Sequence, residues 1–547
     1  MKKLILGFLL LSTIALVQPQ QESQIKPQEK AKEGKLSLIQ KALFSALHLP
    51  QLTKIDPIFL RKGTDLCEEE KESIKIRQKT THKALQKLLN DQTLDEDSMP
   101  SIGIVSSGGG ERAMISTIGL LAGLQQNGIV DCCQYISTLS GSTWAILSWI
   151  FHDISLLELG KFLRKNQITK TVNLTKQDYE ATVHRLLEKM AYDQPISFGD
   201  LWGAFLTSLL FSDLPNRGHS LKISSIQGKI LEGNYPMPIF TCIENDSGQF
   251  AEWIEVSPFE AGSKYFKAWC PLSAFGKKFV KGQTTDPAPE QSLGFFISVF
   301  GSAYAVTFHR ILFEIYWQLK ASLQARLDKL PLPKTITNNL SSFILRNFDK
   351  FLNSDKSDFT KDIQFSPPEV RNLTYKMSGY PLEKSKFLQL FDAGIDFNLP
   401  FPPLMRRGVD VMIVCDASSN INDGPDHAMR GAMAYAKRKG YSFPQIDFTN
   451  IDKKRVNLFY DENDSRAPII VYCPNLKPFP TLKFTYTDKE FKNLETFMRE
   501  SGVQAKDTII QAIKIAMQNK QANNSIDSND LSKILDQLDE DYISKGM

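Results

Sequence analysis

The sequence predicts an α/β fold with a mostly parallel central sheet, helices on both faces, and a helical cap or insertion. A short apolar segment, Ile102–Ser106, is followed by a helical pattern over Ala113–Gln126 and by a second apolar segment, Gln134–Leu139. Strand, helix and strand in this order predict a βαβ unit with parallel strands. Further core strands are predicted from short apolar segments far along the chain, with a helix at Ala428–Lys439 between the last two: Pro238–Cys242, Val409–Cys415 and Ile469–Val471.

The composition is that of a globular protein. Of 547 residues, 42% are apolar and 23% are charged, which suffices for a large core. A net charge of +4 over this length gives no concentrated basic field, so we expect no nucleic-acid partner. The seven cysteines form no C-x-x-C pair and the seven histidines no H-E-x-x-H motif, so we predict neither a metal nor a cofactor. The sequence makes no prediction of the oligomeric state.

The N-terminus has the pattern of a signal peptide or N-terminal anchor over residues 1–20. Met1–Lys3 is basic and Leu4–Val17 is apolar, and this run is shorter than a membrane-spanning helix needs. We therefore expect export, with the protein secreted or associated with the cell envelope. Residues 21–57 are linker and lead-in, and helical spacing of apolar residues extends from about Leu36 to Asn90.

The main domain is predicted over residues 58–517. Asp91–Pro100, rich in Asp, Ser and Pro, ends the helical lead-in, so the core of the domain begins at about residue 98. Residues 275–375 are mixed in pattern with a helical middle, and we expect them to form a cap or insertion. Residues 518–547 are polar and are expected to be at most loosely packed.

A run of three glycines follows the first strand of the βαβ unit. The loop Ser107–Arg112 (SGGGER) lies at the carboxyl end of that strand, where open α/β sheets bind their ligands. Successive glycines let the backbone approach a ligand closely and turn several N–H groups the same way, and the following helix favours negative charge at its start. The loop therefore suits an oxyanion hole.

A second loop of small residues follows the second strand. Thr138–Ser142 (TLSGS) lies between that strand and a helix that begins near Thr143, and it resembles the nucleophile elbow of hydrolases. Such a turn would present the Ser140 hydroxyl group at the edge of the sheet.

The glycine loop also satisfies a dinucleotide-binding pattern. Gly108, Gly110 and Ala113 match G-x-G-x-x-G/A, which is a weak signal alone. A dinucleotide domain carries an acidic residue at the end of its second strand, whereas this strand ends in Ser140–Ser142. This difference favours a hydrolase; two tight βα turns without catalytic function are the remaining alternative.

Ser107–Met114 (SGGGERAM) and Leu139–Trp144 (LSGSTW) resemble the catalytic domain of cytosolic phospholipase A2 and fungal lysophospholipase B, which are patatin-like acyl hydrolases with a Ser/Asp dyad. The similarity extends from about residue 58 to about residue 500. Further segments follow in the family's order: Phe198–Gly203 (FGDLWG), Val256–Gly262 (VSPFEAG), Gly294–Ala303 (GFFISVFGSA) and Asp392–Pro400 (DAGIDFNLP).

The resemblance implies an activity and the residues that carry it. Ser140 matches the nucleophile and Asp392 the base of the dyad, so no histidine is required. Gly109 and Gly110 match the oxyanion-hole glycines, and Arg112 matches the arginine thought to meet the substrate phosphate. The implied function is a phospholipase A2 or lysophospholipase that cleaves fatty-acyl esters of phospholipid or lysophospholipid at a membrane surface, with peripheral membrane contact.

The chain departs from the family in two ways. Thr138 stands where the family usually has glycine, and a β-branched residue there is expected to strain the elbow. The sequence does not decide whether this lowers activity. We expect no counterpart of the family's calcium-binding C2 domain, because the segment before the catalytic region is shorter than a β-sandwich of about 100 residues. We therefore expect calcium-independent action.

Two alternatives stay open from the sequence. The chain could be a catalytically weak or inactive lipid-binding relative. It could also be an esterase with a Ser-His-Asp triad, for which Ser140, Asp416 and His427 have a suitable order.

Overall fold

The computed structural model describes residues 38–49, 56–165, 174–244, 251–302, 320, 322–330, 332–352, 368–418, 425–477, 479 and 486–521. The predicted signal peptide or anchor lies outside the described residues, as does the predicted tail from residue 522 onward. Parts of the predicted cap, chiefly residues 303–319 and 353–367, also lie outside them.

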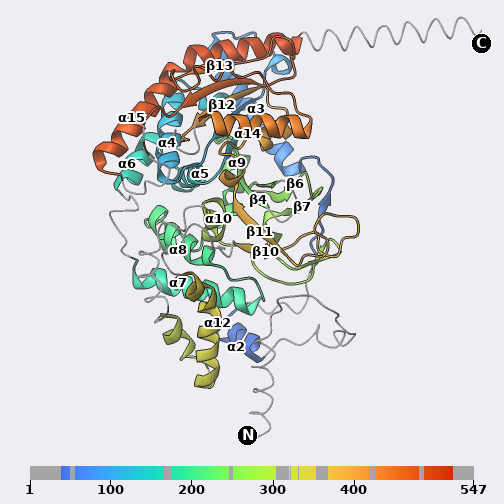
Figure 1. Ribbon diagram of the computed structural model, residues 1–547, viewed down its shortest axis with the longest axis vertical. Coiled ribbons are helices and arrows are strands. Elements are labelled where there is room, and N and C mark those ends of the chain that lie inside the picture. Colours follow the sequence, from blue (N-terminus) through green and yellow to red (C-terminus); the bar gives the residue numbers. More distant parts are fainter. Residues whose placement is uncertain are drawn as a thin grey trace, which may run out of the picture.

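One sheet of twelve strands forms the centre of the part of the chain that the structure describes (Figure 1). The main strand order is β1-β7-β6-β5-β4-β3-β2-β12-β14-β13. The five central strands run parallel to one another, which confirms the predicted α/β class with its parallel centre. They are β4 (Met237–Glu244), β3 (Tyr135–Thr138), β2 (Ile102–Ser106), β12 (Val411–Asp416) and β14 (Ile469–Pro474).

Antiparallel strands, which the sequence analysis did not predict, extend this parallel centre at both edges. One edge carries β5 (Glu252–Val256), β6 (Glu260–Ser263), β7 (Ala268–Pro271) and β1 (Arg61–Lys62), and the other carries β13 (Asn457–Phe459). A side branch, β11 (Phe387–Asp392) with β10 (Glu369–Arg371), joins the sheet at β4, and β8 (Phe279–Val280) and β9 (Gln283–Thr284) form a separate hairpin.

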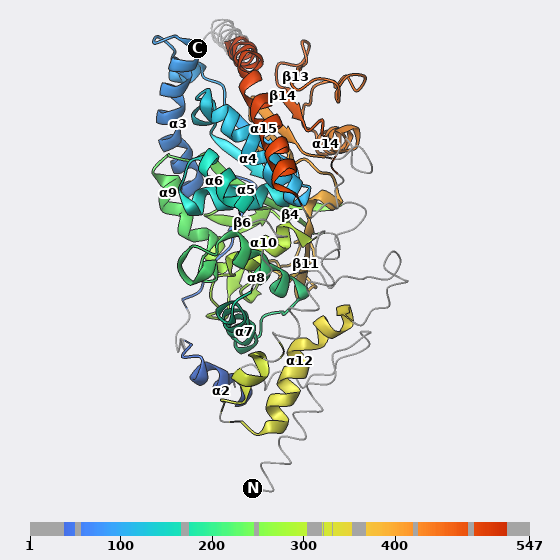
Figure 2. The ribbon, with the colours of Figure 1, turned by 90° about the vertical axis from the view of Figure 1, so that its left-hand side faces the viewer.

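Helices cover both faces of the sheet. Figure 2 shows α4 and α15 on one side of the central strands and α14 on the other. Helix α4 approaches α15 closely because its glycines carry no side chain: a Cβ at Gly123 would lie 2.1 Å from the carbonyl oxygen of Arg499. The helices around the sheet are α3 (Glu68–Leu89), α4 (Gly110–Gln126), α5 (Gly141–His152), α6 (Leu156–Lys165), α9 (Gln227–Leu231), α13 (Pro402–Arg406), α14 (Pro425–Lys439) and α15 (Asp488–Gln504).

A second group of helices lies beyond the β10–β11 end of the sheet, in the lower half of Figure 1. Its members are α2 (Leu38–Ala46), α7 (Lys176–Ala191), α8 (Phe198–Leu210), α10 (Leu293–Phe300) and α12 (Lys334–Leu352). Glycines again allow close packing, because a Cβ at Gly203 of α8 would lie 1.9 Å from the carbonyl oxygen of Gly294 in α10. The predicted cap at 275–375 contributes α10 and α12 to this group, and α2, α7 and α8 come from earlier in the chain.

The described helices include none with both the length and the apolar composition that a membrane span requires.

Candidate active site

Ser140 lies at the sharp turn between β3 and α5. Its backbone has φ 52° and ψ −127°, a conformation that costs a residue with a side chain about 1–3 kcal/mol. The side chain is 1% exposed, and the hydroxyl group has no hydrogen-bond partner among the described residues. A strained strand-to-helix turn that carries an uncommitted serine hydroxyl is the geometry of a nucleophile elbow.

Hydrogen bonds from neighbouring residues hold the elbow in this conformation. Ser142 Oγ lies 2.8 Å from the carbonyl oxygens of Ser106 and Leu139, and it accepts the Leu139 N–H group at 3.1 Å. The Thr143 N–H group donates to the Ser140 carbonyl oxygen at 3.0 Å. The Ser142 side chain thus joins the turn after β3 to the end of β2.

Thr138 does not carry the strain that the sequence analysis expected at this position. It is the last residue of β3 and pairs in register with Phe240 of β4. Its hydroxyl group lies 2.9 Å from that of Thr143, and its carbonyl oxygen accepts a hydrogen bond from the Thr241 hydroxyl at 2.9 Å. Extended backbone suits a β-branched residue, and the unusual backbone angles occur two residues later, at Ser140.

The glycine loop packs directly against the elbow. Gly109 (φ 132°) and Gly110 (φ 56°) have backbone angles that favour glycine, and α4 begins at Gly110. A Cβ at Gly141 would lie 1.8 Å from the carbonyl oxygen of Gly110, and a Cβ at Gly108 would lie 3.0 Å from Cβ of Ser140. Glycine is therefore required on both sides of this contact, which brings the candidate oxyanion loop beside the candidate nucleophile.

Asp392 reaches the same region from the opposite direction. β11 runs antiparallel to β4, and its last residue, Asp392, pairs with Cys242 of β4. Along β4, Cys242 comes two residues after Phe240, the partner of Thr138. Because β5 pairs with residues 240–244 along the other edge of β4, β11 lies on the same edge as β3. The carboxyl end of β3 and the carboxyl end of β11 therefore meet along one edge of β4.

The Asp392 side chain is held in a buried position, with 1% exposed. Its Oδ1 accepts the Gly394 N–H group at 2.9 Å, and its own N–H group donates to Ser302 Oγ, just after α10, at 3.0 Å. The family resemblance predicted Asp392 as the base, whereas no role was predicted for Ser302.

Glu111 is a buried acid that sequence reasoning did not single out. It lies between Gly110 and Arg112 in the first turn of α4, and neither carboxyl oxygen has a hydrogen-bond partner among the described residues. Burial raises the pKa of Glu111 to about 8. A carboxyl group beside the oxyanion loop is therefore largely protonated at neutral pH.

Arg112 lies beneath the glycine loop. Its side chain is 0% exposed, and Nη1 donates to the Phe479 carbonyl oxygen at 2.9 Å. A Cβ at Gly109 would lie 2.8 Å from Nη2, so the guanidinium group packs against that residue. In this conformation Arg112 supports the loop, and a substrate phosphate has no open access to it.

The three residues of the alternative triad differ in exposure. His427 is exposed in α14, whereas Ser140 and Asp416 are buried. Asp416, at the end of β12, accepts the Tyr472 hydroxyl at 2.5 Å and the Ser418 N–H group at 2.7 Å. Ser140 and Asp416 therefore both lie at the sheet, whereas the exposed His427 does not share their buried position.

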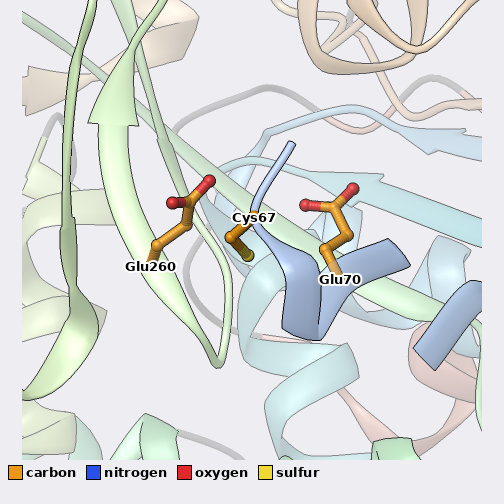
Figure 3. Close-up of side chains that lie close together, drawn as sticks. All are labelled: Cys67, Glu70 and Glu260. Carbon is orange, nitrogen blue, oxygen red and sulfur yellow. The ribbon is translucent and has the colours of Figure 1, made fainter. Parts of the chain in front are cut away.

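One group of potential metal ligands occurs among the described residues, far from this loop. Figure 3 shows the side chains of Cys67, Glu70 and Glu260, which lie close together. Each carboxylate is already bound by an arginine: Arg407 donates to Glu70 at 2.6 and 2.9 Å, and Arg61 donates to Glu260 at 3.0 and 2.7 Å. Burial raises the pKa of the Cys67 thiol to about 12. A protonated thiol between two arginine-bound carboxylates does not suit a cation.

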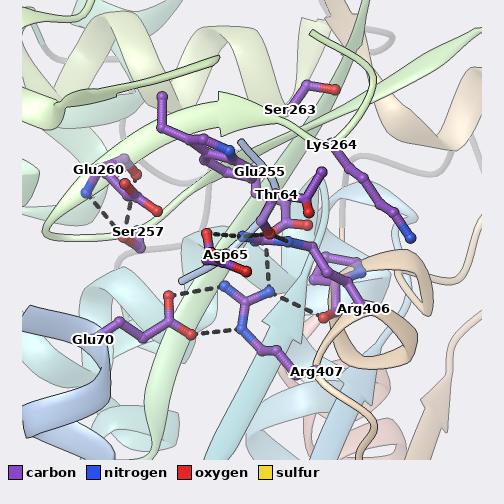
Figure 4. A network of polar contacts seen from close by, with 12 residues as sticks. Thr64, Asp65, Glu70, Glu255, Ser257, Glu260, Ser263, Lys264, Arg406 and Arg407 are labelled. Carbon is purple, nitrogen blue, oxygen red and sulfur yellow. Dashed lines mark hydrogen bonds and ion pairs between the residues drawn. The ribbon is translucent and has the colours of Figure 1, made fainter. Parts of the chain in front are cut away.

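Arg407 also belongs to a buried ion network with Arg406, Glu70 and Glu255 (Figure 4). Arg407 donates to Glu70 and, at 2.7 Å, to Glu255, and Arg406 donates to Glu255 at 2.8 Å. The Arg407 guanidinium also lies 5.5 Å from the ring centre of Tyr135, the first residue of β3. Arg407 thus lies beside the first residue of β3, whereas Glu255 pairs with Thr241, the residue after the β4 partner of Thr138.

Comparison with known proteins gives the family and supports the fold. The chain matches the family model described as "Lysophospholipase catalytic domain" over residues 102–535. It is 27% identical over 543 residues to mouse (Mus musculus) cytosolic phospholipase A2 zeta, a match that covers 84% of this chain and 62% of the length of that protein.

Two solved structures share the fold. Human GIVD cytosolic phospholipase A2 aligns with a TM-score of 0.68 at 23% identity, over 84% of this chain and 69% of that one. The same human protein in complex with methyl gamma-linolenyl fluorophosphonate aligns with a TM-score of 0.62 at 23% identity, over 85% of this chain and 66% of that one. The match to the family model spans most of the chain, and the protein therefore belongs to the lysophospholipase catalytic-domain family.

Proposed function

We propose that the protein is a phospholipase A2 or lysophospholipase that hydrolyses fatty-acyl esters of glycerophospholipids, with Ser140 as nucleophile and Asp392 as base. The observation that carries this proposal is the convergence of β3 and β11 on one edge of β4, which brings both residues to the carboxyl end of the parallel strands. Family membership supports the reaction class, because the matched model is a lysophospholipase catalytic domain.

The first half of the reaction forms an acyl-enzyme. Asp392 accepts the proton of the Ser140 hydroxyl as Oγ attacks the ester carbonyl carbon. The N–H groups of Gly109 and Gly110 stabilise the negative oxygen of the tetrahedral intermediate, and one such donor contributes about 3–4 kcal/mol. Asp392 then returns the proton to the departing alcohol oxygen of the lipid, and the ester bond breaks.

The second half releases the fatty acid. Asp392 takes a proton from water, whose oxygen attacks the acyl carbon, and the proton passes to Ser140 as the acyl–oxygen bond breaks. No histidine takes part, in keeping with the exposed position of His427. Neither a metal nor an organic cofactor is needed for these steps.

The substrate is proposed to be phospholipid or lysophospholipid at a membrane surface, with peripheral contact between protein and membrane. Arg112 is the proposed ligand of the substrate phosphate. Because its guanidinium group is buried against Gly109 in this structure, this role requires that lipid binding make the group accessible. Export through the N-terminal segment is proposed from the sequence pattern alone, and cell fractionation with N-terminal sequencing of the mature protein tests it.

Fatty-acid release from mixed phospholipid and lysophospholipid vesicles, with a calcium chelator present, tests the proposed function. We expect release by the parent protein and by His427→Ala, and loss of release by Ser140→Ala and Asp392→Asn. Binding to vesicles without release from any lipid would instead favour an inactive lipid-binding relative. Loss of activity in His427→Ala would favour the triad.

A further inference from the structure

Asn398 connects the loop that carries Asp392 to the glycine loop. It lies six residues after Asp392, and its side-chain Nδ2 donates to the Gly108 carbonyl oxygen at 3.1 Å and to Ser418 Oγ at 2.9 Å. A backbone carbonyl can only accept a hydrogen bond, so the amide nitrogen must be the atom that faces Gly108. The side chain is 7% exposed, which shields both bonds from water.

The side-chain amide of Asn398 occupies a slot between two glycines. A Cβ at Gly108 would lie 2.6 Å from Asn398 Oδ1, and a Cβ at Gly394 would lie 3.2 Å from the same atom. A side chain at position 108 would displace the amide. The Asn398 side chain is thus built into the contact between the two loops.

The bond to Gly108 controls the direction of a neighbouring N–H group. The carbonyl of Gly108 and the N–H of Gly109 belong to one planar trans peptide unit, so they point in opposite directions and rotate together. Glycines on both sides leave this unit otherwise free to turn, and Gly109 has φ 132°. A donor that holds the Gly108 oxygen therefore also fixes the direction of the Gly109 N–H group.

Ser418, the second acceptor, is fixed to the core strand β12. Its N–H group donates to Asp416 Oδ1 at 2.7 Å, and the preceding Ala417 N–H group donates to Ser107 Oγ at 2.6 Å. Asn398 therefore orients the Gly108–Gly109 peptide with respect to the end of the parallel sheet.

We propose that Asn398 is a positioning residue that orients the Gly109 N–H group toward the oxyanion. The inference rests on the proposed function, because it assigns Asn398 to the same reaction. It acts on the transition state, in which negative charge develops on the carbonyl oxygen, and not on the binding of the ground-state substrate.

Asn398→Asp and Asn398→Ala test this inference in the full-length protein. Asn398→Asp keeps the shape of the side chain and replaces the donor with an acceptor; Asn398→Ala removes the group without adding charge. The matched control is Asn372→Asp, since Asn372 is also buried and its Nδ2 donates to the carbonyl oxygens of Leu382 at 2.8 Å and Ser385 at 2.9 Å. Asn372 follows β10 at the end of β11 distant from Asp392.

The measurements are kcat and KM on a soluble short-chain acyl ester, the rate of labelling by a long-chain fluorophosphonate, and the unfolding midpoint. We expect both Asn398 variants to lower kcat and the labelling rate by about 100-fold, with KM within about threefold of the parent value. Asn372→Asp should lower the unfolding midpoint and leave kcat within about twofold.

A folded Asn398 variant that keeps kcat within about threefold of the parent would overturn the inference. A control that loses as much kcat as Asn398→Asp would also overturn it, because the loss would then follow stability. If Asn398→Asp does not fold, Asn398→Ala decides by the same criteria. A parent protein with neither hydrolysis nor labelling would overturn the proposed function as well, whereas an active parent with active Asn398 variants would overturn this inference alone.

Discussion

Ser140 and Asp392 are carried to one edge of β4 by strands that run in opposite directions. β3 ends beside Phe240 and β11 ends beside Cys242, so sheet register fixes Asp392, the last residue of β11, and the start of the turn that carries Ser140. Residues on strands are positioned more precisely than residues on loops.

Gly141→Ala should disable the site. The new Cβ would lie 1.8 Å from the Gly110 carbonyl oxygen, so the elbow and the oxyanion loop must move apart. We expect a loss of about 1–3 kcal/mol in the free energy of unfolding and a fall in kcat of about 100-fold or more. Gly228→Ala in α9 is the control, because a Cβ there meets no atom within 4 Å. Equal activity in the two variants would contradict the close contact between the loops.

Glu111→Gln should change how stability depends on pH. Burial raises the pKa of Glu111 from its ordinary 4.5 to about 8, so between these values the folded protein holds a proton that the unfolded chain has released. The stability of the parent protein therefore falls as pH rises from about 4.5 to about 8 and then levels off. The glutamine variant has no such group, and its advantage in unfolding free energy should grow from near zero at about pH 4 to roughly 3–5 kcal/mol above about pH 8.

Urea unfolding of both proteins across this pH range measures the difference. Curves that stay parallel from about pH 4 to about pH 9 would show that the Glu111 carboxyl group is not held protonated in the folded protein.

Arg407→Met should destabilise the fold without changing the chemistry. Arg407 holds Glu70 and Glu255 in the buried network, and removal of one member of a buried ion network leaves uncompensated charge, at a cost of about 3–5 kcal/mol. Because Arg407 lies beside the first residue of β3, at the end of that strand distant from Ser140, kcat per folded molecule should not change. Lys71→Met is the control, because the pair Lys71–Glu68 is exposed and screened by solvent. Equal unfolding midpoints for the two variants would contradict the role given to Arg407.

Arg112→Lys distinguishes two roles of one residue. Its guanidinium group contacts Gly109 and the Phe479 carbonyl, so we expect a loss of about tenfold or more on a phosphate-free ester. A proposed contact with the substrate phosphate adds a further loss on phospholipid. Unchanged kinetics on the phosphate-free ester would exclude support of the oxyanion loop, and equal losses on both substrates would exclude the phosphate contact.

The βαβ unit could be predicted from sequence because its signals are local. Ile102–Ser106 is buried throughout, and the observed β2 has the predicted bounds. β11 was not predicted, because the apolar Phe387 and Phe391 on its other face hide the alternation in the sequence and its partner, β4, lies about 150 residues away. The alternation of the buried Leu388, Leu390 and Asp392 is the signal that could have found it.

The candidate site was predictable only in part for the same reason. The elbow and the glycine loop are short motifs, but the position of Asp392 came from the family resemblance alone. Asn398 lies in the matching segment Asp392–Pro400, but the sequence predicts no role for it. Its acceptor, Gly108, is 290 residues away in sequence. The burial of Arg112 and of Glu111 depends on how the loop packs, which composition and spacing do not specify.

The most direct test of the central claim is the mass-spectrometric mapping of the site that a long-chain fluorophosphonate labels. The probe transfers a phosphonyl group to an activated serine hydroxyl and releases fluoride, so it reports nucleophilicity at a named atom. We expect labelling of Ser140 in the parent protein and in His427→Ala, and labelling that is slower by about 100-fold or more in Asp392→Asn. Labelling at another residue, or undiminished labelling of Ser140 in Asp392→Asn, would contradict it.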